Sequence, residues 1–342
     1  MLDQPKGWIK SRVAAVVDYD SFHIVDDFTL EIKTIKPYPF FPYLLSHPYL
    51  VGVEPEAAQK EEIIGTGPFK LKENVQDQYV TVEKFEDYWD QKPNFKRIVF
   101  KTVPDSNPRL LALQAGEVDM ALDPPTASLK QLAGDEKYSV NLSTRVSTVD
   151  LKFNYTKKPM EDVALRKAVS MAINRKEILD TVLEGVGSPA RTIVTPEVLF
   201  SAEGQMKGFP YDPEGARKLL EEAGYKDTNG DGYREKDGET VNLILAFYSA
   251  PGYKEIAETV QSYLNLVGIK SEIVFWESGT YWEEFTGGSF DICVDFSRFF
   301  WGAPSTLLYD AFYSKSGLPG VWYQGVSAEV DILIEEAMEQ DW

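Results

Sequence analysis

Short segments of alternating apolar and polar residues recur along the chain, and longer segments with helical spacing lie between them. In residues 290–296 the apolar positions recur every second residue, the period expected of a strand that packs one face against a core. In residues 163–183 they recur every three to four residues, as on one side of a helix. The strands predicted in this way are 28–35, 69–72, 79–83, 118–122, 149–155, 241–248, 269–276 and 290–296, and the helices are 107–115, 163–183, 211–224, 253–267 and 330–338. Strands and helices that alternate in this order predict an α/β chain.

The predicted strand at 290–296 leads into a run of large aromatic residues. Arg-Phe-Phe-Trp at 298–301 follows it, and Gly-Ala-Pro at 302–304 then forms a turn. An arginine beside aromatic side chains at the end of a strand is suited to the wall of a site for a small polar or chelated ligand. The same aromatic residues would also fill an ordinary core, which composition alone favours.

Length, charge and cysteine content narrow the class of protein. A chain of 342 residues indicates at least two domains. The formal net charge of −19 argues against nucleic acid and anionic membranes as partners, because both require a basic surface. The single cysteine, Cys293, excludes an internal disulfide, and its apolar surroundings predict a small buried residue. We find neither a run of about 18 apolar residues nor a signal peptide at the start, so we expect either a cytosolic protein or a missing N-terminal segment.

A loop at 227–239 has some features of a calcium site. Asp227, Asn229 and Asp231 stand at positions one, three and five, and glycine stands at position six, as in calcium-binding loops. Position twelve should be a bidentate glutamate, but Gly238 stands there. Asn-Gly and Asp-Gly pairs are also common in tight turns. A solvated turn is therefore favoured, and a calcium site is the alternative.

Residues suited to catalysis are few. The chain has two histidines and one cysteine in an apolar strand, and no serine lies in a nucleophile-elbow motif. A hydrolase with paired carboxylates is the enzymatic alternative, but no spacing among the 54 acidic residues singles out a pair. The residue content therefore gives little support for an enzyme.

A series of short motifs extends over most of the chain. They are Gly65-Thr-Gly-Pro-Phe69, Tyr88-Trp89, Ile98–Asp105, Ala112–Asp119, Phe153-Asn154, Leu165–Arg175 and Tyr211–Gly224. In their residues and in their order they resemble the peptide/nickel-type solute-binding proteins of ABC importers. This resemblance implies a periplasmic-binding-protein-like fold, with two large α/β lobes that close over a ligand and a smaller additional domain.

The resemblance also implies an incomplete chain. We expect residues 1–58 to form part of the small domain, 59–147 part of lobe one, and 148–342 lobe two. A signal segment would precede the chain, and the protein would be periplasmic or a cell-surface lipoprotein. Its expected partners are a small ligand and an ABC transporter permease, without nucleic acid, and we expect a monomer.

The residues after the strand at 290–296 bear on the ligand. Peptide binders of the family usually carry an aspartate there, which pairs with the α-amino group of the ligand and supplies the counter-charge that a buried ammonium requires. Here no aspartate precedes Asp310, and Trp-Gly-Ala-Pro at 301–304 is similar to the nickel-binding branch. The resemblance therefore implies nickel, or another metal, bound as a small organic chelate. An oligopeptide or dipeptide is the alternative, and no resident cofactor is required.

The same resemblance suggests roles for individual residues. Arg298 would pair with the carboxylates of a chelate, although an ordinary salt bridge is an equally open role, and Trp301 would pack on the chelate. His47 would complete the coordination of a metal, although a solvated loop position is favoured for it. The expected ligand-binding residues are Arg298, Phe300, Trp301, Ser305, Tyr309, Asn154 and Arg145, and the candidate metal ligands are His47 and, for calcium, Asp227, Asn229 and Asp231.

Overall fold

The chain divides into two compact units in the computed structural model. One unit consists of Met1–Ile9 and Leu45–Val140, and the other of Lys10–Leu44 and Asn141–Trp342. The structure describes residues 13–14, 16–46, 50, 64–143, 146–198, 201–298, 308–309, 311–314 and 328–339. Among these residues, no helix combines the length and the apolar composition that crossing a membrane requires. The expected division into three domains at residues 58 and 147 stays a prediction.

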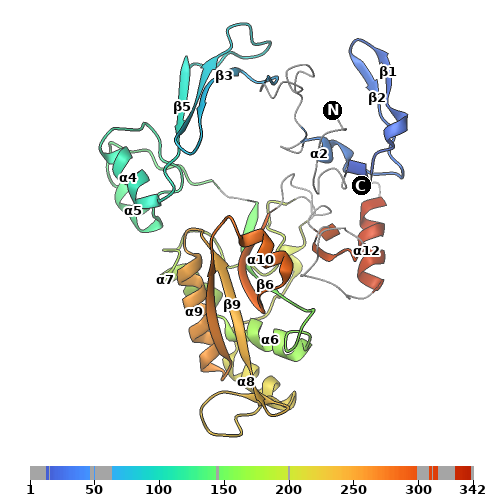
Figure 1. Ribbon diagram of the computed structural model, residues 1–342, viewed down its shortest axis with the longest axis vertical. Coiled ribbons are helices and arrows are strands. Elements are labelled where there is room, and N and C mark those ends of the chain that lie inside the picture. Colours follow the sequence, from blue (N-terminus) through green and yellow to red (C-terminus); the bar gives the residue numbers. More distant parts are fainter. Residues whose placement is uncertain are drawn as a thin grey trace. The chain divides into compact units, whose positions relative to one another are not determined.

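A four-stranded sheet forms the centre of the second unit (Figure 1). Its strands stand in the order β10–β9–β11–β6, with bounds Lys270–Trp276, Asn242–Tyr248, Ile292–Arg298 and Ser147–Phe153. β9 runs parallel to both β10 and β11, whereas β6 is antiparallel to β11. The carboxyl ends of β9, β10 and β11 therefore share one edge of the sheet with the amino end of β6.

Alternate residues of these strands face two separate clusters of apolar side chains. On one face, Leu245 and Val294 are fully buried in a large core, to which helices α6 (Val163–Ala172), α8 (Pro213–Glu222) and α9 (Tyr253–Leu266) contribute. On the other face, Ala246 and Cys293 pack in a smaller cluster with residues of α10 (Tyr281–Gly287). The alternation of residues in the sequence reflects these two faces of the sheet. The prediction that Cys293 is buried is confirmed.

The helix predicted over 163–183 is interrupted, and this part of the prediction is wrong. α6 ends at Ala172, and α7 (Arg175–Thr181) begins after two intervening residues. Ile173 has an extended backbone, and the Asn174 side chain accepts a hydrogen bond from the Glu177 amide as an N-cap. Asparagine caps a helix better than it continues one, so the apolar stripe belongs to two helices in succession.

The second unit also contains further elements outside this sheet. They are η1 (Tyr19–Ser21), β1 (His23–Asp26), β2 (Thr29–Glu31), α2 (Phe41–Leu45, whose last residue falls in the first unit), η2 (Glu203–Gln205), β7 (Glu235–Lys236), β8 (Glu239–Thr240) and α12 (Ala328–Glu339). β1 pairs with β2, and β7 with β8, each as an antiparallel ribbon. The strand predicted at 28–35 is therefore much shorter than expected, and the helix predicted at 330–338 is confirmed as α12.

The first unit contains an antiparallel sheet of three strands (Figure 1). Its strands are β3 (Phe69–Val75), β4 (Tyr79–Lys84) and β5 (Arg97–Lys101), in that order. Two helices follow along the chain, α4 (Ser106–Gln114) and α5 (Thr126–Ala133). Residues 118–122, predicted as a strand, form none here, and α5 has no counterpart in the prediction.

Candidate functional site

The carboxyl ends of β9, β10 and β11 mark the candidate site. In open α/β sheets, ligands bind beyond the carboxyl ends of the parallel strands. Arg298 is the last residue of β11, where its backbone pairs with Ser147 of β6. The structure therefore places Arg298 at the edge where a ligand would be expected. Among the other predicted site residues, Phe300, Trp301, Ser305, Arg145 and His47 lie outside the described residues.

Tyr309 lies beyond this edge in sequence and contacts another aromatic residue. Its ring stacks on Tyr313 with 4.7 Å between the ring centroids, and the Tyr313 hydroxyl bonds to Glu335 of α12 at 2.5 Å. The contact with Glu335 is the largest of several effects that raise the pKa of Tyr313 to about 12. Tyr309 is thus joined through Tyr313 to α12.

Asn154 lies at the opposite end of the sheet and has a structural role. It directly follows β6, is only 1 % exposed, and donates to the carbonyls of Gly288 and Phe290 at 3.2 and 3.1 Å. Its side-chain oxygen accepts from both the amide and the hydroxyl of Thr156. All the polar atoms of this side chain therefore have partners within the protein, at the edge away from the carboxyl ends of the parallel strands.

A buried polar cluster lies on β6 and β11 and was not predicted from the sequence. In the ladder between these strands, Asp295 stands directly opposite Asp150, and Cys293 stands opposite Lys152. The ammonium of Lys152 forms an ion pair with Asp150 at 2.9 Å and also hydrogen-bonds the hydroxyl of Ser297. The period of two identified Asp295 only as a residue between apolar ones, because the pairing of the two strands cannot be read from one of them.

Burial dominates the electrostatics of this cluster. Asp295 is 3 % exposed, and burial raises its pKa to about 6, although the charge of Lys152, the Phe296 amide and the Tyr281 hydroxyl act in the opposite direction. Burial, reinforced by the nearby Asp295 carboxylate, also holds the pKa of the Cys293 thiol well above its usual range. Cys293 is therefore a protonated, unreactive thiol.

Tyrosines line the same edge of the sheet. Tyr248 ends β9, and its ring lies 4.3 Å from that of Tyr281 at the start of α10 and 5.2 Å from that of Tyr253 at the start of α9. Burial raises the pKa of both Tyr281 and Tyr253 far above the usual value. These hydroxyls therefore remain protonated and act as neutral hydrogen-bonding groups beside Asp295.

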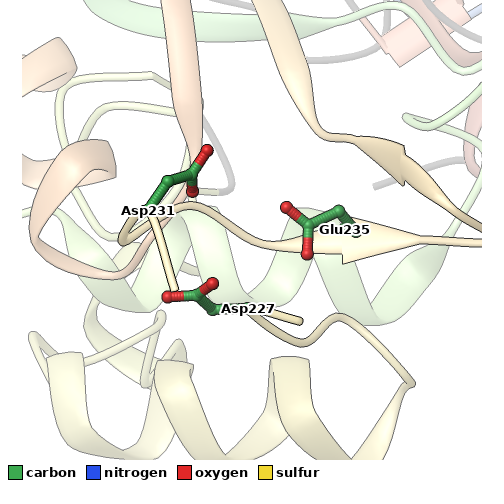
Figure 2. Close-up of side chains that lie close together, drawn as sticks. All are labelled: Asp227, Asp231 and Glu235. Carbon is green, nitrogen blue, oxygen red and sulfur yellow. The ribbon is translucent and has the colours of Figure 1, made fainter. Parts of the chain in front are cut away.

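The loop at 227–235 brings three carboxylates together (Figure 2). One oxygen from each of Asp227, Asp231 and Glu235 lies within 4.8 Å of the others, a spacing that suits oxygen ligands around one hard cation. Figure 2 shows the three side chains turned toward a common space. Glu235 was not among the predicted ligands, although position nine of a calcium loop often contributes through water.

The same loop is held by its own hydrogen bonds. Asp227 accepts from the amides of Gly230 and Gly232 at 2.6 and 3.0 Å. Glu235, only 7 % exposed, accepts from the Thr228 amide and from the Asn229 side chain at 2.7 and 3.0 Å. These hydrogen bonds hold a tight turn, and a calcium site at this loop stays a prediction.

Comparison with known proteins gives matches along most of the chain. The family model for the bacterial extracellular solute-binding proteins, family 5 Middle, matches residues 3–318. The nickel-binding periplasmic protein of Escherichia coli (strain K12) is 32% identical over 263 residues, which are 75% of this chain and 49% of that protein. The oligopeptide-binding protein AppA of Bacillus subtilis (strain 168) is 31% identical over 305 residues, which are 86% of this chain and 54% of that protein. The chain thus spans about half the length of these curated relatives.

A solved structure agrees with these matches. NikA from Brucella suis, in complex with Fe(III)-EDTA, superposes with a TM-score of 0.81 at 25% identity, over 97% of this chain and 69% of that one. The expected α/β fold of the periplasmic binding proteins is confirmed.

Proposed function

Because the chain belongs to family 5 of the bacterial extracellular solute-binding proteins, we propose that the protein captures a small ligand outside the cytoplasm and delivers it to an ABC transporter permease. The family match over residues 3–318 is the observation that carries this proposal. It also favours a binding protein over the carboxylate-dependent hydrolase that the sequence left as the alternative.

Capture would occur by closure of two lobes over the ligand. A ligand shifts the equilibrium toward the closed form only if it makes more favourable contacts there. Arg298, at the carboxyl end of β11, is the residue that we assign to ligand carboxylates, because a guanidinium pairs with a carboxylate through two hydrogen bonds. Phe300, Trp301, Ser305, Tyr309 and Arg145 complete the proposed set of ligand contacts.

For the ligand we propose nickel or another metal, carried as a small organic chelate. Trp-Gly-Ala-Pro at 301–304 and the absence of an aspartate before Asp310 support this choice. The E. coli relative is described as nickel-binding, and the Brucella structure holds a metal chelate. The metal would enter as cargo within the chelate, and His47 is the side chain that we assign to its free coordination position.

A peptide is the second candidate. The relative described as oligopeptide-binding is almost as similar, at 31% identity, and matches a larger share of this chain. A peptide offers the same carboxylate to Arg298, but its α-amino group needs a negative partner when it is buried. The two candidates therefore differ in the charge that the site must neutralise.

Native mass spectrometry combined with elemental analysis distinguishes them. The full-length protein is purified without added metal, and the mass and metal content of whatever remains bound are measured. We expect one metal per protein together with a small organic molecule. A ladder of peptide masses without metal would contradict the nickel preference, and a chain that holds neither after exposure to both Fe(III)-EDTA and a peptide mixture would contradict ligand capture.

A further inference from the structure

Asp295 is a buried carboxylate with an oxygen that no described residue satisfies. Its Oδ1 atom is inaccessible to solvent and accepts no hydrogen bond from the part of the chain that the structure describes. The residue is 3 % exposed and stands in the middle of β11. A buried ionised carboxylate without a full set of partners is costly, and proteins commonly resolve this cost by protonation.

The charges around Asp295 are unbalanced. Asp150 stands directly opposite on β6, and opposite residues of an antiparallel pair lie about 5 Å apart on the same face of the sheet. Lys152 is the described cation of the cluster, and its ammonium contacts Asp150 at 2.9 and 3.0 Å and also bonds Ser297. Two carboxylates thus face one ammonium, which already forms an ion pair with Asp150.

The remaining neighbours of Asp295 are neutral. Tyr281 of α10, Tyr253 of α9 and Cys293 of β11 contribute to its electrostatics, and burial raises the pKa of all three groups, so that they keep their protons. Tyr248 of β9 is in ring contact with both of these tyrosines. No described neighbour other than Lys152 therefore brings a compensating positive charge to Asp295.

We propose that Asp295 is a proton-binding switch that controls the end of β11. In the acid form, its carboxyl proton bonds the opposing Asp150 carboxylate, and Lys152 remains on Asp150 and Ser297. In the basic form, Asp295 is ionised and draws Lys152 away from these partners. The last residues of β11, Ser297 and Arg298, are then held less firmly against β6.

The position of this switch links it to ligand binding. It lies in β11, three residues before Arg298, which ends the strand, and its effect on the ligand rests on the proposed function. The switch predicts that the backbone position of Arg298 is better fixed in mild acid than at neutral pH. A pKa of Asp295 raised to about 6 places the change between these conditions.

Urea unfolding at several pH values tests the switch without any ligand. A carboxyl group whose pKa is raised on folding stabilises the folded state below its unfolded pKa, and this stabilisation is lost as the pH rises through the folded value. Between pH 8 and pH 5 we expect the folding equilibrium constant of the wild type to gain about tenfold over that of Asp295→Asn. Hydrogen exchange, corrected for its intrinsic pH dependence, should show the amides of 296–298 better protected at pH 5 in the wild type and unchanged in the variant.

Two further variants keep the test decisive. Asp291→Asn removes a carboxylate of similar burial just before the same strand, but one that is ion-paired with Lys157 and bonded to the Ile244 amide. It should lose stability and keep the wild-type pH profile.

Asp150→Asn frees Lys152 for Asp295 and should move the transition to lower pH, which tests the switch even if Asp295→Asn does not fold. Identical profiles for the wild type, Asp295→Asn and Asp150→Asn would overturn the switch and leave the proposed function intact. The absence of any bound ligand would overturn the proposed function and leave the switch intact.

Discussion

Replacing Asn154 tests whether this residue stabilises the fold or contacts a ligand. Alanine at this position removes four hydrogen bonds, two to the carbonyls of Gly288 and Phe290 and two from Thr156, with lengths between 2.6 and 3.2 Å. Each intramolecular hydrogen bond contributes about 0.5–1.5 kcal/mol net. Because the site is 1 % exposed, water cannot replace them without rearrangement. We expect Asn154→Ala to lower the free energy of unfolding by about 2–4 kcal/mol.

Aspartate is the more informative substitution at the same position. It keeps the acceptor that binds Thr156 but turns a carboxylate oxygen toward the two carbonyls that the amide now serves. Buried charge and repulsion then add to the lost hydrogen bonds, so Asn154→Asp should cost more than Asn154→Ala at pH 7.5. The pKa of the new carboxyl would be raised, and its proton would restore a donor. Stability should therefore recover as the pH falls through that raised value.

Urea unfolding followed by tryptophan fluorescence at pH 7.5 and pH 5 measures both variants. Asn242→Ala, at an exposed asparagine that begins β9, is the matched control and should change stability by less than about 0.5 kcal/mol. A loss below 0.5 kcal/mol for Asn154→Ala, or a milder effect for aspartate than for alanine, would refute the reasoning. Unchanged stability with weakened ligand binding would make Asn154 a ligand residue after all.

Three further predictions follow from other contacts. Arg298→Ala should weaken binding of a carboxylate-bearing ligand by about 2–5 kcal/mol in calorimetry, whereas Lys218→Ala, on the exposed side of α8, should not, and equal affinities would remove Arg298 from the site. Asp227→Ala should cost about 1 kcal/mol of stability in EDTA, because it removes two hydrogen bonds to loop amides, and a cost seen only in added calcium would reveal a cation site instead. The pKa of Asp162, the N-cap of α6, is lowered. Burial acts to raise it, but hydrogen bonds from Lys236, the Ala164 amide and Tyr225 outweigh burial. Its contribution is therefore complete above pH 3.8 and is lost as the pH falls through the lowered pKa, so the stability gap of about 1–2 kcal/mol between the wild type and Asp162→Ala should close in acid, as unfolding curves from pH 7 to pH 2 would show.

The elements of the second unit were largely predictable from the sequence. The strands at 241–248, 269–276 and 290–296 and the helix at 253–267 appear in the structure with small shifts at their ends. Their apolar residues repeat at the period of the element that they form, and local pattern is therefore enough. The interruption at Asn174 was missed, because the apolar stripe continues across it while a capping side chain starts a new helix.

The candidate site was less predictable, because it depends on which strands are neighbours. Arg298 could be placed at the end of a strand from the sequence alone. The contact of Asp295 with Asp150 and Lys152 depends on the antiparallel pairing of β11 with β6, two strands more than 130 residues apart in the chain. A period of two says that a residue faces one side, but not which charges face the same side from the next strand.

Two buried carboxylates, one just before β11 and one within it, show why function is expected at the carboxyl end of the sheet. Asp291, just before β11, is 5 % exposed, and its oxygens contact Lys157 at 3.3 Å and the Ile244 amide at 2.7 Å. Asp295, four residues later and equally buried, has one oxygen without a partner among the described residues. Folding alone favours the first arrangement, since every unsatisfied buried group lowers stability. An unbalanced charge that persists beside a balanced one is typical of positions that serve binding or regulation, and it lies where ligands of open α/β sheets bind.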